Sequence, residues 1–161
     1  METGWDSQLA KFLTDLLSVQ EETLEVLGKK REALVAADAE GLATLSQQEE
    51  QLIERLQQSL RTREEMLKRA AAEGLPSDSL RSLTRAIPKD SREELPDQLK
   101  LVTARSRLLQ HQSLTNWVLA QRTLIHLSQM LEILATGGRL QPTYDKGGST
   151  VASGGLVDRA A

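Results

Sequence analysis

Apolar residues recur at three- and four-residue intervals along most of the chain, which is the spacing of amphipathic helices. Over residues 5–37 these intervals predict a first long helix, in which Gly28 is a mild interruption rather than a stop. Asp38 is a good N-cap for a second long helix, predicted to end before Gly74. Because only a residue or two separates the two helices, they must form an antiparallel hairpin.

Two further helices are predicted after the hairpin. Residues 77–87 have the pattern of a short helix, and residues 97–135 have the pattern of a third long one. Ser91 followed by Glu94 matches a capping box that would open the next segment. Pro96 either lies in the first turn of the long helix or divides a small turn from it, and both interpretations are open. Two consecutive glycines directly after residue 136 predict its end.

The helical pattern divides the chain into two parts. For residues 1–137 we expect an all-α domain: an elongated, antiparallel, coiled-coil-like bundle of three long helices plus one short helix. Residues 138–161 are rich in glycine and poor in apolar residues, so we expect a disordered, flexible tail. Tyr144 is the only tyrosine of the chain and lies in this tail. It could fold back on the bundle or serve as a docking anchor, and both interpretations are open.

The third long helix carries two apolar stripes instead of one. The first stripe consists of Asn116, Ala120, Thr123, Leu127, Met130 and Leu134. The second stripe consists of Leu114, Trp117, Val118, Leu124, Ile125 and Leu131. A helix needs only one apolar stripe to dock on its own core. The second stripe must therefore be covered by another helix of the chain, by a second copy of the chain, or by a partner.

Asn116 is the only asparagine and lies on the first stripe. One interpretation is an ordinary surface residue. The other is a buried polar residue that fixes the register of the helix at some cost in stability. The sequence leaves both open.

Composition excludes several classes of function. The formal net charge is −3, with 20 Lys and Arg against 23 Asp and Glu, and no basic cluster indicates nucleic-acid binding. The chain has no cysteine, so disulfides and thiolate metal sites are ruled out. Neither a secretory signal nor an apolar run long enough to span a membrane is evident. We therefore expect a cytoplasmic protein that does not insert into membranes.

Catalytic and metal-binding patterns are also missing from the sequence. His111 and His126 are fifteen residues apart, whereas two metal ligands on one helix need a spacing of three or four. Carboxylates such as Glu49 and Glu54 alternate with arginines such as Arg55, as on a solvated helix face. We therefore expect neither an enzyme nor a bound metal or cofactor.

One segment runs from Glu21 to Leu67 and includes the stretch REALVAADAEGLATLSQQEEQLIERLQQSLRTREEML. It resembles the first hairpin of FlgN-type flagellar export chaperones, and Arg63 takes the place of an arginine near the end of that family's second helix. The third long helix resembles the family's last helix from Asn116 to Leu134, followed by a glycine-containing tail with Tyr144.

This resemblance implies a cytosolic chaperone that binds hook–filament junction proteins before their export. In that family the client segment is a C-terminal amphipathic helix. The second stripe would receive it, and Tyr144 would dock the complex on a component of the flagellar export gate. The alternative is a structural coiled-coil adaptor, or a homodimer in which the second stripe pairs with its own copy.

Overall fold

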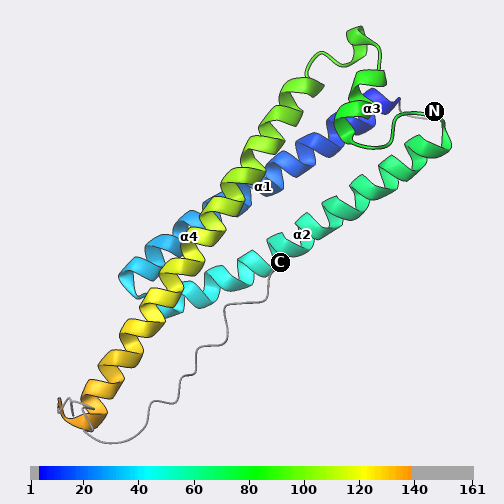
Figure 1. Ribbon diagram of the computed structural model, residues 1–161. Coiled ribbons are helices and arrows are strands. Elements are labelled where there is room, and N and C mark those ends of the chain that lie inside the picture. Colours follow the sequence, from blue (N-terminus) through cyan, green and yellow to red (C-terminus); the bar gives the residue numbers. More distant parts are fainter. Residues whose placement is uncertain (1–3, 139–161) are drawn as a thin grey trace, which may run out of the picture. The chain divides into compact units, whose positions relative to one another are not determined.

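The computed structural model describes residues 4–138, and the regular elements in this range are all helical. They are α1 (Trp5–Ala36), α2 (Ala39–Ala72), α3 (Leu80–Ala86), the 3₁₀ turn η1 (Lys89–Ser91) and α4 (Leu95–Thr136), as Figure 1 shows. The prediction of an all-α fold with three long helices and one short helix is confirmed.

Contacts divide the chain into two compact units, Met1–Ile125 and His126–Ala161, and α4 contributes residues to both. The second unit is described only from residue 126 to residue 138. The predicted tail, residues 138–161, lies almost wholly outside the described residues. Its boundary with the helical domain therefore stays a prediction.

A tight connection joins α1 to α2. Ala37 adopts the left-handed conformation with φ of 53°, and the backbone N–H of Asp38 donates to the carbonyl oxygen of Ala33 at 3.0 Å. The Asp38 carboxylate then accepts a hydrogen bond of 2.9 Å from the backbone N–H of Gly41, which caps the second helix. The predicted hairpin and its cap are confirmed, and Gly28 lies inside α1 without ending it.

The end of α2 also follows the prediction. Gly74 has a φ of 74°, a conformation that glycine adopts without strain. The backbone N–H of Leu75 donates to the carbonyl oxygen of Ala70 at 2.8 Å, which completes a glycine C-cap. The next helix is shorter than the predicted 77–87, because Ser79 caps it through the backbone N–H of Ser82 at 3.1 Å.

The predicted capping box at Ser91 and Glu94 is wrong. The backbone N–H of Ser91 donates to the carbonyl oxygen of Pro88 at 3.1 Å and closes the 3₁₀ turn instead. The side chain of Arg92 then donates to the carbonyl oxygen of Arg85 at 2.9 Å, which holds this turn against the end of α3. α4 therefore begins only at residue 95, with a proline in its first turn, where the missing N–H does no harm.

The main core lies where α1, α2, α3 and the start of α4 meet. Its members are mostly leucine: Leu9, Phe12, Leu13, Met66, Ala70, Leu80, Leu83, Ile87 and Leu95. A smaller cluster of Val19, Val26 and Leu52 lies between α1 and α2. Deep burial is thus concentrated at the end of the first unit that holds α3.

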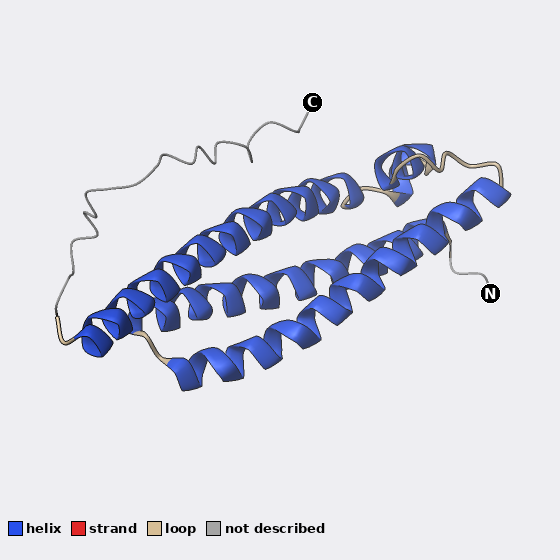
Figure 2. Ribbon diagram, turned by 60° about the horizontal axis from the view of Figure 1, so that its bottom comes forward, coloured by secondary structure: helices blue, strands red, loops and turns tan. Residues whose placement is uncertain are grey.

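Within residues 4–125, α4 runs parallel to α1 and antiparallel to α2 (Figure 2). α1 approaches α2 more closely than it approaches α4. Polar side chains bridge the wider interface. The amide of Gln20, which is buried, donates to Ser106 Oγ at 2.9 Å and to the carbonyl oxygen of Val102 at 3.2 Å. The guanidinium of Arg105 donates to the carbonyl oxygen of Leu17 at 2.9 Å.

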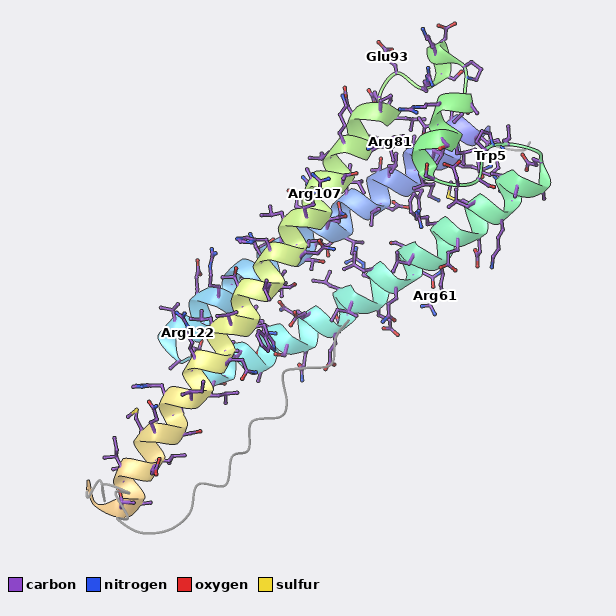
Figure 3. The ribbon with its side chains drawn as sticks, viewed as in Figure 1. Trp5, Arg61, Arg81, Glu93, Arg107 and Arg122 are labelled. Atoms are coloured by element: carbon purple, nitrogen blue, oxygen red, sulfur yellow. The ribbon has the colours of Figure 1, made fainter. Side chains whose placement is uncertain are left out.

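Trp5, labelled in Figure 3, joins the start of α1 to the end of α2. Its indole Nε1 donates a hydrogen bond of 2.6 Å to Glu73 Oε2. The guanidinium carbon of Arg69 lies 4.1 Å from the centroid of the tryptophan ring, and Arg69 also donates to the side chain of Gln8. These contacts of Trp5 with Arg69 and Glu73 hold the start of α1 to the end of α2, at the open end of the hairpin.

Within residues 4–138, no helix is both long enough and apolar enough to cross a bilayer.

Candidate partner-binding surface on α4

Neighbouring residues of α4 face opposite environments. Asn116 is 5% exposed and Trp117 is 60% exposed. The side-chain amide of Asn116 donates a hydrogen bond of 2.8 Å to the carbonyl oxygen of Leu27 on α1. Ala120 and Thr123, one and two turns further on, are partly buried. The interpretation of Asn116 as a buried polar residue is confirmed, and the first stripe faces the interior of the first unit.

The second stripe is exposed in the first unit. Its five residues there are Leu114, Trp117, Val118, Leu124 and Ile125, and none of them is buried by other described residues. Spacings of three, four and seven residues place these side chains side by side on the surface of a helix. They therefore form one apolar surface, which we call the α4 face.

The second unit adds further exposed apolar side chains. Leu131, the sixth residue of the second stripe, is exposed. So are Leu127, Met130 and Leu134, which belong to the first stripe. The expectation that the first stripe docks on the chain's own core thus holds only as far as Thr123. The described part of the second unit contains only the end of α4, and it offers no other helix to cover these residues.

The charged residues of α4 between Asp97 and Glu132 are all basic. Between Asp97 and Glu132 the helix has no acidic residue, but it has one lysine and three arginines. Arg105 lies 3.7 Å from Glu21 of α1. The side chains of Arg107 and Arg122, both labelled in Figure 3, are exposed and form no hydrogen bond or ion pair with any residue in the described range 4–138. The exposed side of this helix is therefore apolar with unpaired cations.

A second apolar surface lies between α2 and α4 in the first unit. It is a groove of about 740 Å³, and its apolar walls come from Leu16 of α1, from Leu56 and Leu60 of α2, and from Leu99, Val102 and Leu109 of α4. This groove was not predicted, because it depends on the distance at which α4 packs from α1 and α2. Residue spacing within single helices does not determine that distance.

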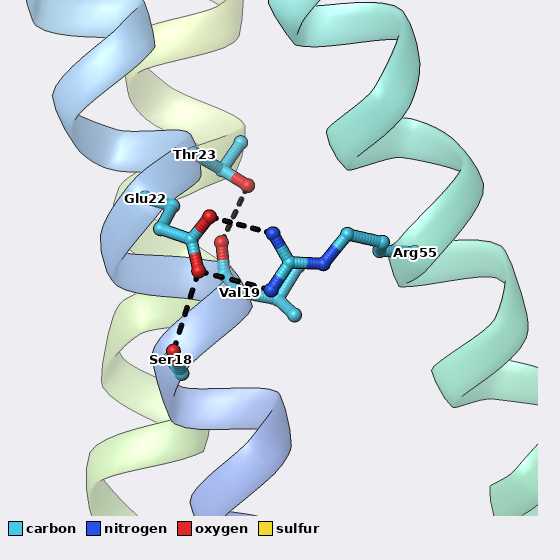
Figure 4. A network of polar contacts seen from close by, with 5 residues as sticks. All are labelled: Ser18, Val19, Glu22, Thr23 and Arg55. Carbon is cyan, nitrogen blue, oxygen red and sulfur yellow. Dashed lines mark hydrogen bonds and ion pairs between the residues drawn. The ribbon is translucent and has the colours of Figure 1, made fainter.

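A bidentate ion pair connects the polar sides of α1 and α2 (Figure 4). Arg55 donates to the two carboxylate oxygens of Glu22 at 2.5 and 2.9 Å, and Ser18 Oγ donates to the same carboxylate at 3.3 Å. The hydrogen bonds from Arg55 are the main reason why the pKa of Glu22 lies below its ordinary value. They also raise the pKa of Arg55.

The prediction of a solvated charged face on α2 needs one correction. Glu54 is exposed, as expected, but Glu49 is only partly exposed and pairs with Lys30 of α1. Arg55 likewise reaches across to α1. These charges lie where α2 packs along α1, so they link the two helices instead of only facing water.

The two histidines of the chain are both exposed and belong to different units: His111 to the first and His126 to the second. Among residues 4–138, no group of three or more His, Asp or Glu side chains is arranged to hold a metal ion. Tyr144, the predicted docking residue, lies outside the described residues.

Comparison with known protein families identifies the family of the chain. The family model described as FlgN protein matches residues 1–152, a range that includes every described helix. No curated protein and no solved structure matches the chain.

Proposed function

The chain belongs to the FlgN family, and from this membership and the exposed α4 face we propose the following function. The protein is a cytoplasmic chaperone that binds the C-terminal amphipathic helix of hook–filament junction proteins. It prevents their premature self-association and delivers them to the flagellar export gate. The family indicates a flagellar export chaperone in general, not an enzyme. The identity of the client and the delivery step belong to our proposal.

The observation that carries the proposal is the α4 face itself. Leu114, Trp117 and Leu124 are each more than half exposed. An amphipathic helix that lies along such a surface buries its own apolar stripe against it. Within the first unit, the second stripe would thus be the client-binding surface. Leu131, the sixth residue of the stripe, belongs to the second unit and stays a predicted client-binding residue.

Apolar burial is sufficient to drive this binding. Complete burial of one leucine side chain contributes roughly 1.5–3 kcal/mol, so several such side chains offset the loss of freedom on association. The proposed binding therefore requires no nucleotide, metal or cofactor.

A peptide from the C-terminus of a hook–filament junction protein tests the proposal. The variant Leu114→Ser/Leu124→Ser should lose binding of this peptide in calorimetric titration and keep its helicity by circular dichroism. The matched control is Leu60→Ser/Ile53→Ser, which changes two exposed apolar residues on α2. The control should bind the peptide as the unchanged chain does. Binding lost in the control alone would place the client in the groove between α2 and α4.

The alternative function is a structural adaptor or homodimer that covers the α4 face with a second copy. Sedimentation of the chain with and without the peptide separates the two functions. A tight dimer that ignores the peptide and dissociates on Leu114→Ser/Leu124→Ser would refute the chaperone function.

Delivery to the export gate is assigned to Tyr144 and the tail. Deletion of residues 138–161, or the single change Tyr144→Ala, should leave peptide binding intact and reduce export of the client by cells. Unchanged export in both variants would show that the tail is not the docking element.

A further inference from the structure

Arg107 and Arg122, the two cations of α4 that have no partner among residues 4–138, indicate which charge a partner helix carries. A partner helix with a purely apolar contact surface would need no particular charge on the chaperone. On α4, however, acidic residues are absent from the whole stretch between Asp97 and Glu132, whereas α2 has acidic and basic residues interspersed along its length. The α4 face therefore lies within a positively charged stretch.

Two of these cations border the α4 face, one before its first residue and one along its edge. Arg122 is four residues after Val118 and three residues before Ile125, so its side chain lies beside theirs on the helix surface. Arg107 is seven residues before Leu114, two turns away on the same side of the helix. The two arginines are fifteen residues apart, which corresponds to about 22 Å along the helix axis.

We propose that the helix accepted by the α4 face is acidic: an amphipathic helix of about four turns with carboxylates at the edge of its apolar stripe, near both ends, opposite Arg107 and Arg122. This inference rests on the proposed function and specifies the chemistry of the partner. Arginine suits this task because its planar guanidinium binds a carboxylate through two parallel hydrogen bonds. The same chain uses this geometry between Arg55 and Glu22.

The charges also disfavour a second copy of the chain as the occupant. In a two-fold symmetric pairing of α4 centred between residues 114 and 115, Arg107 of one copy lies opposite Arg122 of the other. Like charges opposite each other repel, and neither copy has an acidic residue between residues 98 and 131 to compensate. An acidic helix satisfies both arginines, whereas a second copy in this pairing satisfies neither.

Three designed peptides test the proposal. Each is an amphipathic helix of about 18 residues with the same leucine stripe. The two flanking positions hold glutamate in the first peptide, glutamine in the second and lysine in the third. The full chain is titrated with each peptide at low and at high salt. The glutamate peptide should bind roughly three- to tenfold more tightly than the glutamine peptide, and the lysine peptide more weakly than both, with the differences shrinking as salt rises.

The arginines are tested by a matched pair of variants. Arg107→Gln/Arg122→Gln should lose the preference for the glutamate peptide. Arg31→Gln/Arg61→Gln removes the same total charge from exposed positions on α1 and α2 and should keep the preference. The charge-reversed variant Arg107→Glu/Arg122→Glu should prefer the lysine peptide, a result that loss of folding cannot produce.

The outcomes separate this inference from the proposed function. If all three peptides bind equally and Leu114→Ser/Leu124→Ser abolishes their binding, the face accepts helices but does not select acidic ones, and only the inference is overturned. If the preference survives in Arg107→Gln/Arg122→Gln, it arises elsewhere and the inference is again wrong. If no peptide binds and the chain forms dimers through α4, both fail.

Discussion

The side-chain amide of Asn116 on α4 donates a hydrogen bond to the carbonyl oxygen of Leu27 on α1, across 89 residues of sequence. Asn116 is buried, so the hydrogen bond to Leu27 replaces one that its amide N–H would form with water in the unfolded chain. The bond also defines a position, because a shift of α4 along α1 by one residue would separate the donor from the acceptor.

Asn116→Ala should lower the free energy of unfolding by about 1–3 kcal/mol, since it removes a buried hydrogen bond and leaves a small void. Chemical denaturation measures this loss. The control is Ser113→Ala on the exposed side of the same helix, with an expected change within about 0.5 kcal/mol. An equal effect of both changes would contradict a specific role for the amide.

Asn116→Leu tests the role of the amide in register. The leucine keeps the bulk of the side chain, so stability should suffer less than with alanine, but α4 should take more than one position along α1. Because the chain has no cysteine, spin labels can be attached at Glu25→Cys and Ser113→Cys without background. The distance distribution between them should broaden in Asn116→Leu. A distribution as narrow as that of the unchanged chain would show that apolar packing alone sets the register.

Gly28→Ala should stabilise the protein by about 1 kcal/mol, because alanine favours the helix and the added methyl group meets no atom within 4 Å. Gly41→Ala provides the contrast. There the methyl group would collide with the Asp38 carboxylate that caps α2. Loss of the cap should leave Gly41→Ala about 1–2 kcal/mol less stable than Gly28→Ala in thermal or chemical unfolding.

The ion pair of Glu22 and Arg55 predicts a dependence of stability on pH. The pKa of Glu22 is lowered in the folded protein, mainly by the hydrogen bonds from Arg55. The contribution of the ion pair to the free energy of unfolding should therefore be fully present above the ordinary glutamate pKa of about 4.3. It should disappear as the pH falls through the lowered pKa of Glu22.

Glu22→Gln should accordingly be less stable than the unchanged chain at pH 7, and the difference should vanish in acid. Denaturation of both proteins over a series of pH values measures it. Glu54→Gln, which removes an exposed carboxylate without a described partner, should show no such dependence. A difference between Glu22→Gln and the unchanged chain that persists at the lowest pH would contradict the assignment.

Trp5→Phe should lower the free energy of unfolding by about 1 kcal/mol, because it removes the hydrogen bond to Glu73 and weakens the contact with Arg69. Trp117→Phe is the matched control. This tryptophan is exposed on α4, and its replacement should change stability by less than about 0.5 kcal/mol. Each variant also retains a single tryptophan, so fluorescence reports separately on the end of the hairpin and on the α4 face.

The helices could be predicted from sequence because local signals determine them. Leucine spacing, the Asp38 cap and the glycine after α2 act over a few residues and were interpreted correctly. The capping box failed for a reason that is also local: Pro88 favours a 3₁₀ turn that takes Ser91 as its last residue. A motif of four residues does not reveal which of two competing turns forms.

The candidate site was less predictable. Both stripes of the third long helix are apolar, and burial of the more apolar one would be the simplest expectation. The structure instead turns the first stripe inward from Asn116 to Thr123 and exposes the stripe with Trp117. The inward position of Asn116 comes with a hydrogen bond to a carbonyl group 89 residues away. The spacing of residues along one helix does not predict such a bond. It does not predict the hydrogen bond between Trp5 and Glu73 either.

Within the first unit, α4 is held by apolar packing at its start and by hydrogen bonds further along. Leu95 anchors its start in the leucine core, whereas Gln20, Arg105 and Asn116 hold its middle by individual hydrogen bonds. Amide hydrogen exchange should therefore be slowest in the second and third turns of α4, because the N–H groups of a first helical turn have no acceptor within the helix. Exchange should quicken toward Ile125, while the hairpin of α1 and α2 remains protected. We therefore expect α4 to open from its later turns within the first unit, so the surface proposed to receive a partner would lie on the part of this helix that costs the least free energy to rearrange.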